Sequence, residues 1–122
     1  MTPQELFDTC VERLIKQGKP AKNNFGACSY LTKCGLKCAV GILLKEGEYS
    51  PIMEGDNVEN LVDNGMLPKR LAEHKLLLMY LQQTHDDTKW SPTNMEDFKL
   101  AADKFSLKWK FDNSKIQQIL SS

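Results

Sequence analysis

The stretch from residue 27 to residue 44, ACSYLTKCGLKCAVGILL, constrains the fold more than any other part of the sequence. It holds three of the four cysteines, a glycine turn at Gly35 and the most apolar short run in the first half of the chain. Residues alternate as in a strand on the approach to this turn. We therefore expect a short β-hairpin near residues 27–37, followed by a helix that starts near Cys38. Gly41 in the apolar run predicts a close approach of another backbone.

The segment before this stretch predicts an amphipathic helix. Thr2 and Glu5 form the S/T-x-x-E pattern of a capping box, and Pro3 occupies the first helical position. Apolar side chains then recur at the helical period as far as Ile15. Gly18 is the expected end of this helix.

The chain after residue 44 predicts further helices with polar segments between them. They are expected over residues 58–62, 68–84 with room for a break near 73–75, 91–105 and 115–120. The helix over 68–84 is apolar nearly all round, so we expect it to be central and buried.

The residues from Leu107 to Phe111 alternate between apolar side chains and lysines, which is typical of a strand. The same segment could equally lie extended on the helices. The predicted fold class is therefore mainly α (α+β). It is a single compact helical domain over residues 1–122, with a hairpin near 27–37 and a third short strand near 107–111 as an option.

Composition argues against several classes of protein. Sixteen basic and sixteen acidic residues cancel in the chain of 122 residues, so no overall charge attracts nucleic acid or an anionic membrane. No apolar run reaches the roughly 18 residues of a membrane span, and the start, MTPQELFDTC, has no signal-peptide core. We expect a cytoplasmic protein with reduced cysteines, no nucleic-acid or membrane partner and no cofactor.

The cysteines allow two interpretations, a metal site or simple packing. Cys28, Cys34 and Cys38 follow a C-x5-C-x3-C spacing, whose first gap does not match the C-x2–4-C pairs of structural zinc sites. A metal site would combine Cys28 and Cys38 with His85, if the helix carrying His85 ends beside the hairpin. Buried free cysteine behaves as a small hydrophobic residue, and packing is our expectation for Cys10 and Cys38.

A thiol-dependent enzyme is a further hypothesis for the same residues. If Cys38 opens a helix, the helix dipole would lower its pKa and favour the thiolate. His85 would then act as the base, and Asp86 or Asp87 would orient the imidazole. Side chains adjacent in sequence diverge on a helix, however, so Asp86 is not expected to point at His85. In a purely structural arrangement, His85 would bond the hairpin backbone and the cysteines would be buried and apart.

Residues 46–56 form an acidic loop with a few apolar side chains. The loop lacks the residue order of an EF-hand, so the simplest interpretation of this segment is a solvent-exposed loop. Exposed apolar residues ringed by charge nevertheless mark interfaces. If the chain is an interaction protein, we expect its partner-binding surface at Tyr49, Ile52, Met53 and Glu54.

Four motifs together resemble a group of small uncharacterised proteins found in bacteriophages and prophages. They are CSY at 28–30, GLKCAVG at 35–41, EYSPIMEG at 48–55 and LQQTHD at 81–86. The resemblance runs from the first helix to about Phe105. It implies that Cys28, Cys38 and the pair of His85 and Asp86 are shared within the group. It implies an origin rather than a mechanism, because the group has no established activity.

Two functional hypotheses follow. The first is a small phage-type accessory protein, non-enzymatic, that binds a host or phage macromolecule as an interaction or inhibitor protein. The second is a metal-binding or thiol-dependent enzyme that uses Cys28, Cys38, His85 and Asp86. Geometry separates them, because zinc needs its ligands about 2.0–2.3 Å from one point. Catalysis needs the Cys38 sulfur within hydrogen-bond reach of His85 in an open cleft.

Overall fold

Helix α1 (Pro3–Gln17) forms as the sequence predicts in the computed structural model, which describes residues 1–22 and 29–122. The Thr2 hydroxyl accepts a hydrogen bond from the Glu5 N–H, and the Glu5 carboxylate accepts one from the Thr2 N–H, which completes the capping box. Gly18 ends the helix in the left-handed conformation, with φ of 87°. One face of α1 is fully buried.

The segment after α1 is mostly loop, with two short 3-10 helices, η1 (Gly41–Leu43) and η2 (Pro51–Met53). The predicted hairpin is wrong for residues 29–37, where Leu31 and Lys37 form one isolated antiparallel bridge. The cause is competition for donors. The Tyr30 N–H, which would extend the ladder beyond the bridge, donates to the Glu54 carboxylate instead, and the outward-facing Leu31 N–H donates to the same carboxylate. Residues 27 and 28 of that prediction lie outside the described residues.

Helices α2 (Val58–Asp63), α3 (Lys69–Ala72) and α4 (Lys75–Asp87) follow. Asn57 caps α2 through its side chain, which accepts a hydrogen bond from the Asn60 N–H at 2.8 Å. The predicted break near residues 73–75 separates α3 from α4. The helix was predicted to be central and buried: one face of α4, with Leu77, Leu78 and Leu81, is buried, but Leu76 is 70% exposed.

The C-terminal third consists of α5 (Glu96–Lys104), an extended segment and α6 (Asn113–Ser121). The optional strand near 107–111 is not formed. The backbone N–H and carbonyl of Lys108 are bonded to the side-chain amide of Gln4, at 2.9 and 3.1 Å. These bonds occupy the groups that a ladder would need, so the segment lies extended along α1.

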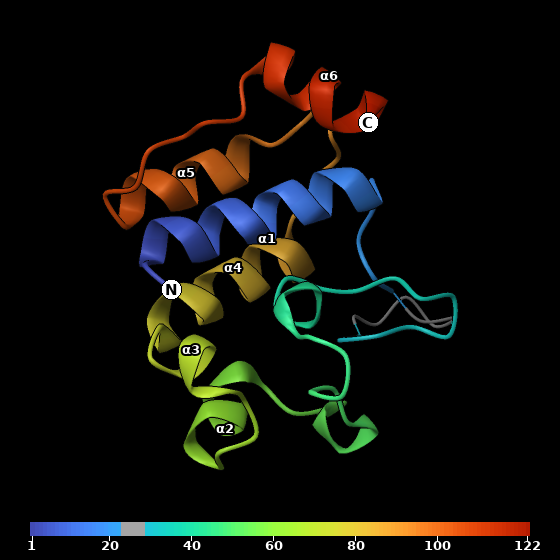
Figure 1. Ribbon diagram of the computed structural model, residues 1–122, viewed down its shortest axis with the longest axis vertical. Coiled ribbons are helices and arrows are strands. Elements are labelled where there is room, and N and C mark those ends of the chain that lie inside the picture. Colours follow the sequence, from blue (N-terminus) through green and yellow to red (C-terminus); the bar gives the residue numbers. More distant parts are fainter. Residues whose placement is uncertain (23–28) are drawn as a thin grey trace.

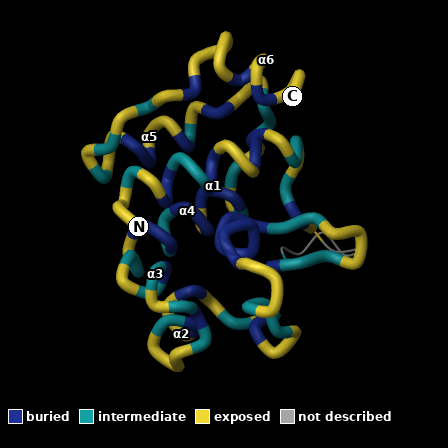
Figure 2. The backbone as a smooth tube through the Cα atoms, in the orientation of Figure 1, coloured by how far each residue is buried: buried dark blue, intermediate teal, exposed yellow. Residues whose placement is uncertain are grey.

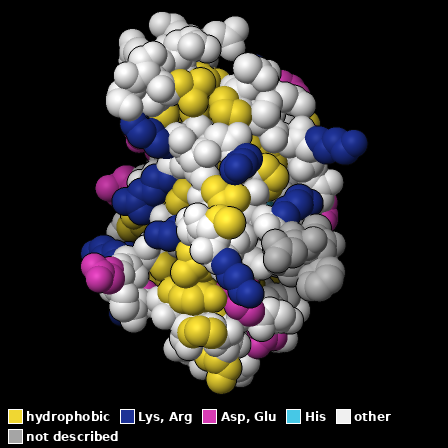
Figure 3. Space-filling view, turned by 90° about the vertical axis from the view of Figure 1, so that its right-hand side faces the viewer, with side chains coloured by type: hydrophobic (Ala, Val, Ile, Leu, Met, Phe, Trp, Pro, Cys, Tyr) yellow, Lys and Arg dark blue, Asp and Glu magenta, His cyan; other side chains and the backbone are white. Residues whose placement is uncertain are grey.

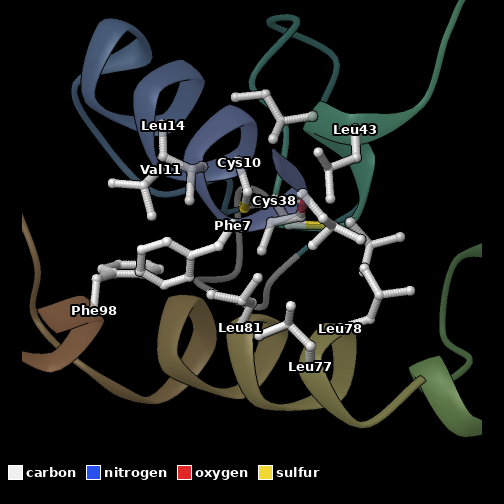
Figure 4. Close-up of a cluster of buried hydrophobic side chains, with 14 of the residues drawn as sticks. Phe7, Cys10, Val11, Leu14, Cys38, Leu43, Leu77, Leu78, Leu81 and Phe98 are labelled. Atoms are coloured by element: carbon white, nitrogen blue, oxygen red, sulfur yellow. Dashed lines mark hydrogen bonds between the residues drawn. The ribbon is translucent and has the colours of Figure 1, made fainter. Parts of the chain in front are cut away.

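The helices surround one cluster of buried apolar side chains (Figures 1 and 2). Helix α6 packs on α1, while α2 and α5 pack on α4. Figure 4 shows side chains of α1 and α4 meeting in the middle, with Cys10 and Cys38 inside the same cluster. Both cysteines are 0% exposed, which confirms the packing prediction for them. The prediction of a mainly α fold is also confirmed.

The loop carrying η1 and η2 is tied to α3 by one ion pair. The Arg70 guanidinium donates to both carboxylate oxygens of Glu48, at 2.6 and 2.7 Å, and also to the Leu43 carbonyl. This paired geometry fixes the loop against the helical part of the fold. None of the helices among the described residues has the length and apolar character needed to cross a lipid bilayer.

Candidate functional site

The last turns of α4 carry a chain of polar side chains centred on Asp86. One carboxylate oxygen, Oδ1, lies 2.8 Å from Nδ1 of His85 and accepts a hydrogen bond from the Gln82 amide at 2.9 Å. The prediction that adjacent side chains diverge is therefore wrong for His85 and Asp86. Both residues lie in the last turn of α4, which ends at Asp87, and the Asp86 side chain is 30% exposed.

His85 anchors the loop that follows α1. Its imidazole is 0% exposed, and Nε2 accepts a hydrogen bond from the Ala21 N–H at 3.1 Å. Because Nε2 is an acceptor, the ring proton lies on Nδ1 and points to Asp86. The backbone that His85 bonds is therefore that of Ala21, and not the predicted hairpin. Trp90 packs against the imidazole and donates from its indole N–H to the His85 carbonyl.

Gln82 connects this chain to the segment around Cys38. Its amide oxygen accepts a hydrogen bond from the Val40 N–H at 3.0 Å. Cys38 accepts a hydrogen bond at Sγ from the Gly41 N–H, at 3.4 Å. Burial raises the pKa of Cys38 to about 12 despite these hydrogen bonds, so its thiol is neutral. The condition for a lowered pKa is not met, because Cys38 does not open a helix and the next element, η1, begins at Gly41.

Glu54 holds two loops together beside Asp86. Its carboxylate accepts hydrogen bonds from the N–H groups of Tyr30 and Leu31 and from the Tyr49 hydroxyl at 2.7 Å. The Tyr30 hydroxyl donates to the Asp56 carbonyl at 2.6 Å. Burial raises the pKa of Tyr49 to about 12, and its hydrogen bond to Glu54 adds to the shift. These bonds fix the wall of a pocket.

The pocket lies between α4, the start of α2 and the two loops joined by Glu54, and has a volume of about 530 Å³. Four carboxylates line it, those of Glu54, Asp56, Glu59 and Asp86. None of the described lining residues is a lysine, arginine or histidine. Tyr30 and Met79 supply apolar surface. A concave site with one sign of charge attracts groups of the opposite sign, so this pocket favours a cation.

The four residues predicted to bind a partner differ in how far they are exposed. Ile52 is 74% exposed, whereas Met53 is 3% exposed and belongs to the core. The expectation that Met53 is exposed is wrong, because the 3-10 turn η2 directs it inward. Tyr49 and Glu54 are half-buried and bond each other. Ile52 is therefore the accessible apolar residue of that set.

The predicted metal ligands are placed as follows. Within residues 1–22 and 29–122, no three His, Cys, Asp or Glu side chains are arranged to hold a metal ion. Cys28, a member of the alternative metal set, lies outside the described residues. Cys34 is exposed in the turn before Gly35. Sequence reasoning missed Met79, Gln82 and Gln83 as pocket residues, although with Asp86 they recur at i, i+3, i+4 and i+7, which places them on one helix face.

A second face of the molecule also exposes apolar side chains. Figure 3 shows hydrophobic side chains in a broken band on the side that carries the loops between α1 and α2, with Lys and Arg side chains beside it. A hollow of about 320 Å³ opens there against Leu31, Leu44 and Tyr49, with Lys37 and Lys45 at its edge. Its charge is mixed, because Glu46 also lines it.

Comparisons with protein-family models, with curated proteins and with solved structures found no significant match to this chain.

Proposed function

We propose that this chain is a small, non-enzymatic accessory protein that binds another protein by receiving a basic side chain in the acidic pocket. The observation that carries the proposal is the pocket itself, with four carboxylates and no basic group among its described lining residues. Its volume of about 530 Å³ falls in the range of roughly 300–1,000 Å³ that is typical of ligand pockets.

The chemistry of the lining suits an arginine or lysine. Glu59 is exposed on α2, so its carboxylate can meet an incoming cation. The Asp86 carboxylate, which already bonds His85 and Gln82, adds negative charge to the same pocket. Met79 and Tyr30 can pack against the aliphatic stem of the same side chain. A guanidinium between carboxylates forms charge-assisted hydrogen bonds, which are stronger than neutral ones.

The proposed origin is a bacteriophage, and the proposed partner is a host or phage protein in the host cytoplasm. Support comes from the resemblance described above, because its motifs supply much of the pocket. Tyr30, Glu54, Gly55, Gln82 and Asp86 all belong to those motifs and line the pocket.

The enzymatic alternative gains no comparable support. A catalytic thiol needs a lowered pKa and access to substrate. Cys38 is buried with a raised pKa. His85 is also buried, and its Nε2 is occupied by the Ala21 N–H.

Binding of two unstructured peptides tests the proposal. One is a short peptide of alternating Arg and Ser residues, and the other replaces each Arg by Glu. Affinity is measured by fluorescence anisotropy, and the contact site by NMR chemical-shift changes. Glu59→Lys reverses a charge in the pocket, whereas Glu12→Lys makes the same change at an exposed position on α1.

We expect the Arg peptide to bind with shifts at Tyr30, Met79 and Gln83, and the Glu peptide not to bind. Glu59→Lys should weaken binding about tenfold, which corresponds to ~1.4 kcal/mol, and Glu12→Lys should have a much smaller effect. Equal losses in the two variants would mean that only overall charge matters. That outcome, or no binding at all, would overturn the proposal.

A further inference from the structure

The outward-facing side of α4 forms a continuous ridge. Leu76, Met79, Tyr80, Gln83 and Asp87 follow the helical spacing i, i+3, i+4, i+7 and i+11, and we call them the α4 ridge. Leu76 is 70% exposed, Gln83 and Asp87 are exposed, and Met79 and Tyr80 are half-buried. An exposed leucine at the start of this only partly covered helix face marks a surface that other chains can contact.

Hollows lie on both sides of the ridge and at its start. At the start, Leu76 borders a hollow of about 320 Å³ with Pro3 and Phe105. On the α2 side, Met79 and Gln83 border the acidic pocket. On the α5 side, Tyr80, Gln83 and Leu100 border a hollow of about 200 Å³. A ridge flanked by depressions can be met by side chains that project from a single partner helix.

The two halves of the ridge differ in polarity. The first half is apolar, because Leu76 and Tyr80 lie there and Phe105 packs on the Tyr80 ring at 5.7 Å between centroids. Lys104 lies over the same ring, with Nζ 5.5 Å from its centroid, so this half carries no excess of negative charge.

The second half is acidic. Asp87 and Asp97 line the hollow on the α5 side, and Glu59 and Asp86 line the pocket on the α2 side. No described residue lining either hollow is a lysine, arginine or histidine. Negative charge therefore flanks the ridge on both sides at this end only.

We propose that the α4 ridge is the docking surface for an amphipathic helix of the partner protein. The partner helix carries apolar residues that pack on Leu76, Tyr80 and Leu100, and lysines or arginines that face the acidic half. This inference rests on the proposed function and specifies the chemistry of the partner. Residues 76–87 span about 18 Å at 1.5 Å per residue, so about three to four turns of the partner helix cover the ridge.

Charge decides between classes of partner. A surface with carboxylates on both sides repels phosphate groups, which disfavours nucleic acid and anionic lipid. A basic amphipathic helix satisfies both halves at once, because its apolar face covers the exposed leucines and its cations pair with the carboxylates.

The test uses the full chain and a labelled model helix, a peptide with leucines at helical spacing and lysines on the remaining positions. A scrambled peptide of the same composition keeps the charge and destroys the apolar face. Leu76→Gln removes the apolar anchor of the ridge, and Leu120→Gln makes the same change at a 42% exposed leucine on α6. Glu59→Lys tests the acidic half, and sedimentation shows whether the chain associates with itself.

We expect the amphipathic peptide to bind at least about tenfold more tightly than its scrambled form and than the Arg–Ser peptide. Leu76→Gln should remove most of this gain, Glu59→Lys should weaken binding, and Leu120→Gln should change little. If the Arg–Ser peptide binds in the pocket but the amphipathic peptide gains nothing from Leu76, the ridge proposal fails and the proposed function stands. If Glu59→Lys changes the affinity of neither peptide, the proposed function fails as well.

Two other results would also overturn the ridge proposal. One is a dimer of this chain that Leu76→Gln dissociates, since the ridge would then bind a second copy. The other is binding of vesicles of anionic phospholipid that depends on Leu76, since the occupant would then be a membrane surface.

Discussion

Gly41 lies directly against the carbonyl oxygen of Tyr30, and a Cβ atom built on Gly41 would stand 2.0 Å from that oxygen. The predicted close approach of another backbone at Gly41 is thereby confirmed. It fixes the turn after Cys38 against the segment that forms one wall of the acidic pocket.

Gly41→Ala should strongly destabilise the protein. The overlap is with backbone, which no side-chain rotation can relieve, so the free energy of unfolding should fall by about 3 kcal/mol. Gly35→Ala is the control, because that site has open space and only the cost of a positive φ, about 1–2 kcal/mol. Urea denaturation measures both, and an equal or smaller loss for Gly41→Ala would contradict the close approach.

Glu54→Ala should loosen the pocket wall. Two backbone N–H groups and one hydroxyl lose their acceptor, and the free energy of unfolding should fall by about 2 kcal/mol. Hydrogen exchange of the Tyr30 and Leu31 amides should accelerate in this variant. Glu46→Ala, at an exposed position of the same loop, should change stability by less than about 0.5 kcal/mol. Unchanged exchange at Tyr30 would argue against the role given to Glu54.

The ion pair between Glu48 and Arg70 predicts a loss of stability in acid. The Arg70 hydrogen bond, with help from the Lys45 N–H, lowers the pKa of Glu48 from 4.5 to about 2. Ionised Glu48 therefore contributes stability above pH ~4.5, and that contribution disappears as the pH falls toward 2. Because the pair is about a quarter exposed, we expect about 1 kcal/mol. Urea denaturation of Glu48→Gln and the wild type should differ at pH 6 and converge near pH 2. A constant difference would contradict the assignment.

The rate of alkylation should distinguish the exposed cysteine from the buried ones. Cys34 is exposed and should react first with iodoacetamide, whereas buried Cys10 and Cys38 should react only after unfolding. Burial raises the pKa of both buried thiols, which removes the reactive thiolate. Mass spectrometry of proteolytic peptides assigns each rate. Rapid labelling of Cys38 in the native protein would revive the thiol-enzyme hypothesis.

The imidazole of His85 should carry its proton on Nδ1. Nε2 accepts from the Ala21 N–H, and Nδ1 faces the Asp86 carboxylate. Long-range 1H–15N NMR spectra distinguish the two ring nitrogens by their chemical shifts. A proton on Nε2 would mean that the loop after α1 is not held in this way.

Elements that depend on local sequence were predicted well. Helix α1 needs only its capping box, its apolar period and Gly18, all of which lie within the segment itself. The break near residues 73–75 was also visible, because charged residues interrupt the apolar period there.

Elements whose backbone bonds distant side chains were predicted poorly. The 29–37 segment has the alternation of a hairpin, yet Glu54 takes the N–H groups of Tyr30 and Leu31. Residues 107–111 have the alternation of a strand, yet Gln4 takes both backbone groups of Lys108. An alternating pattern indicates which side chains share a face, but it does not identify the groups that the backbone will bond. Here those groups are side chains far away in the sequence.

The candidate site, too, could be predicted from the sequence only in part. His85, Asp86 and Cys38 were named from the sequence as alternative catalytic residues, but which groups they bond depends on the fold. The acidic pocket could not be predicted, because its carboxylates come from the start of α2, the η2 loop and the end of α4. Met53 was misplaced because the direction of a side chain in a 3-10 turn is set by the core beneath it.

The bond between Gln4 and Lys108 joins residues 104 positions apart in the chain. Gln4 on α1 is therefore synthesised long before the backbone groups that its side chain bonds. At about 5–20 residues per second, that interval is roughly 5–20 s. During this interval η1 and α4 become available to cover the buried face of α1. The segment around Lys108, where Trp109 packs on Phe7, and helix α6 are the last parts of its cover to be made.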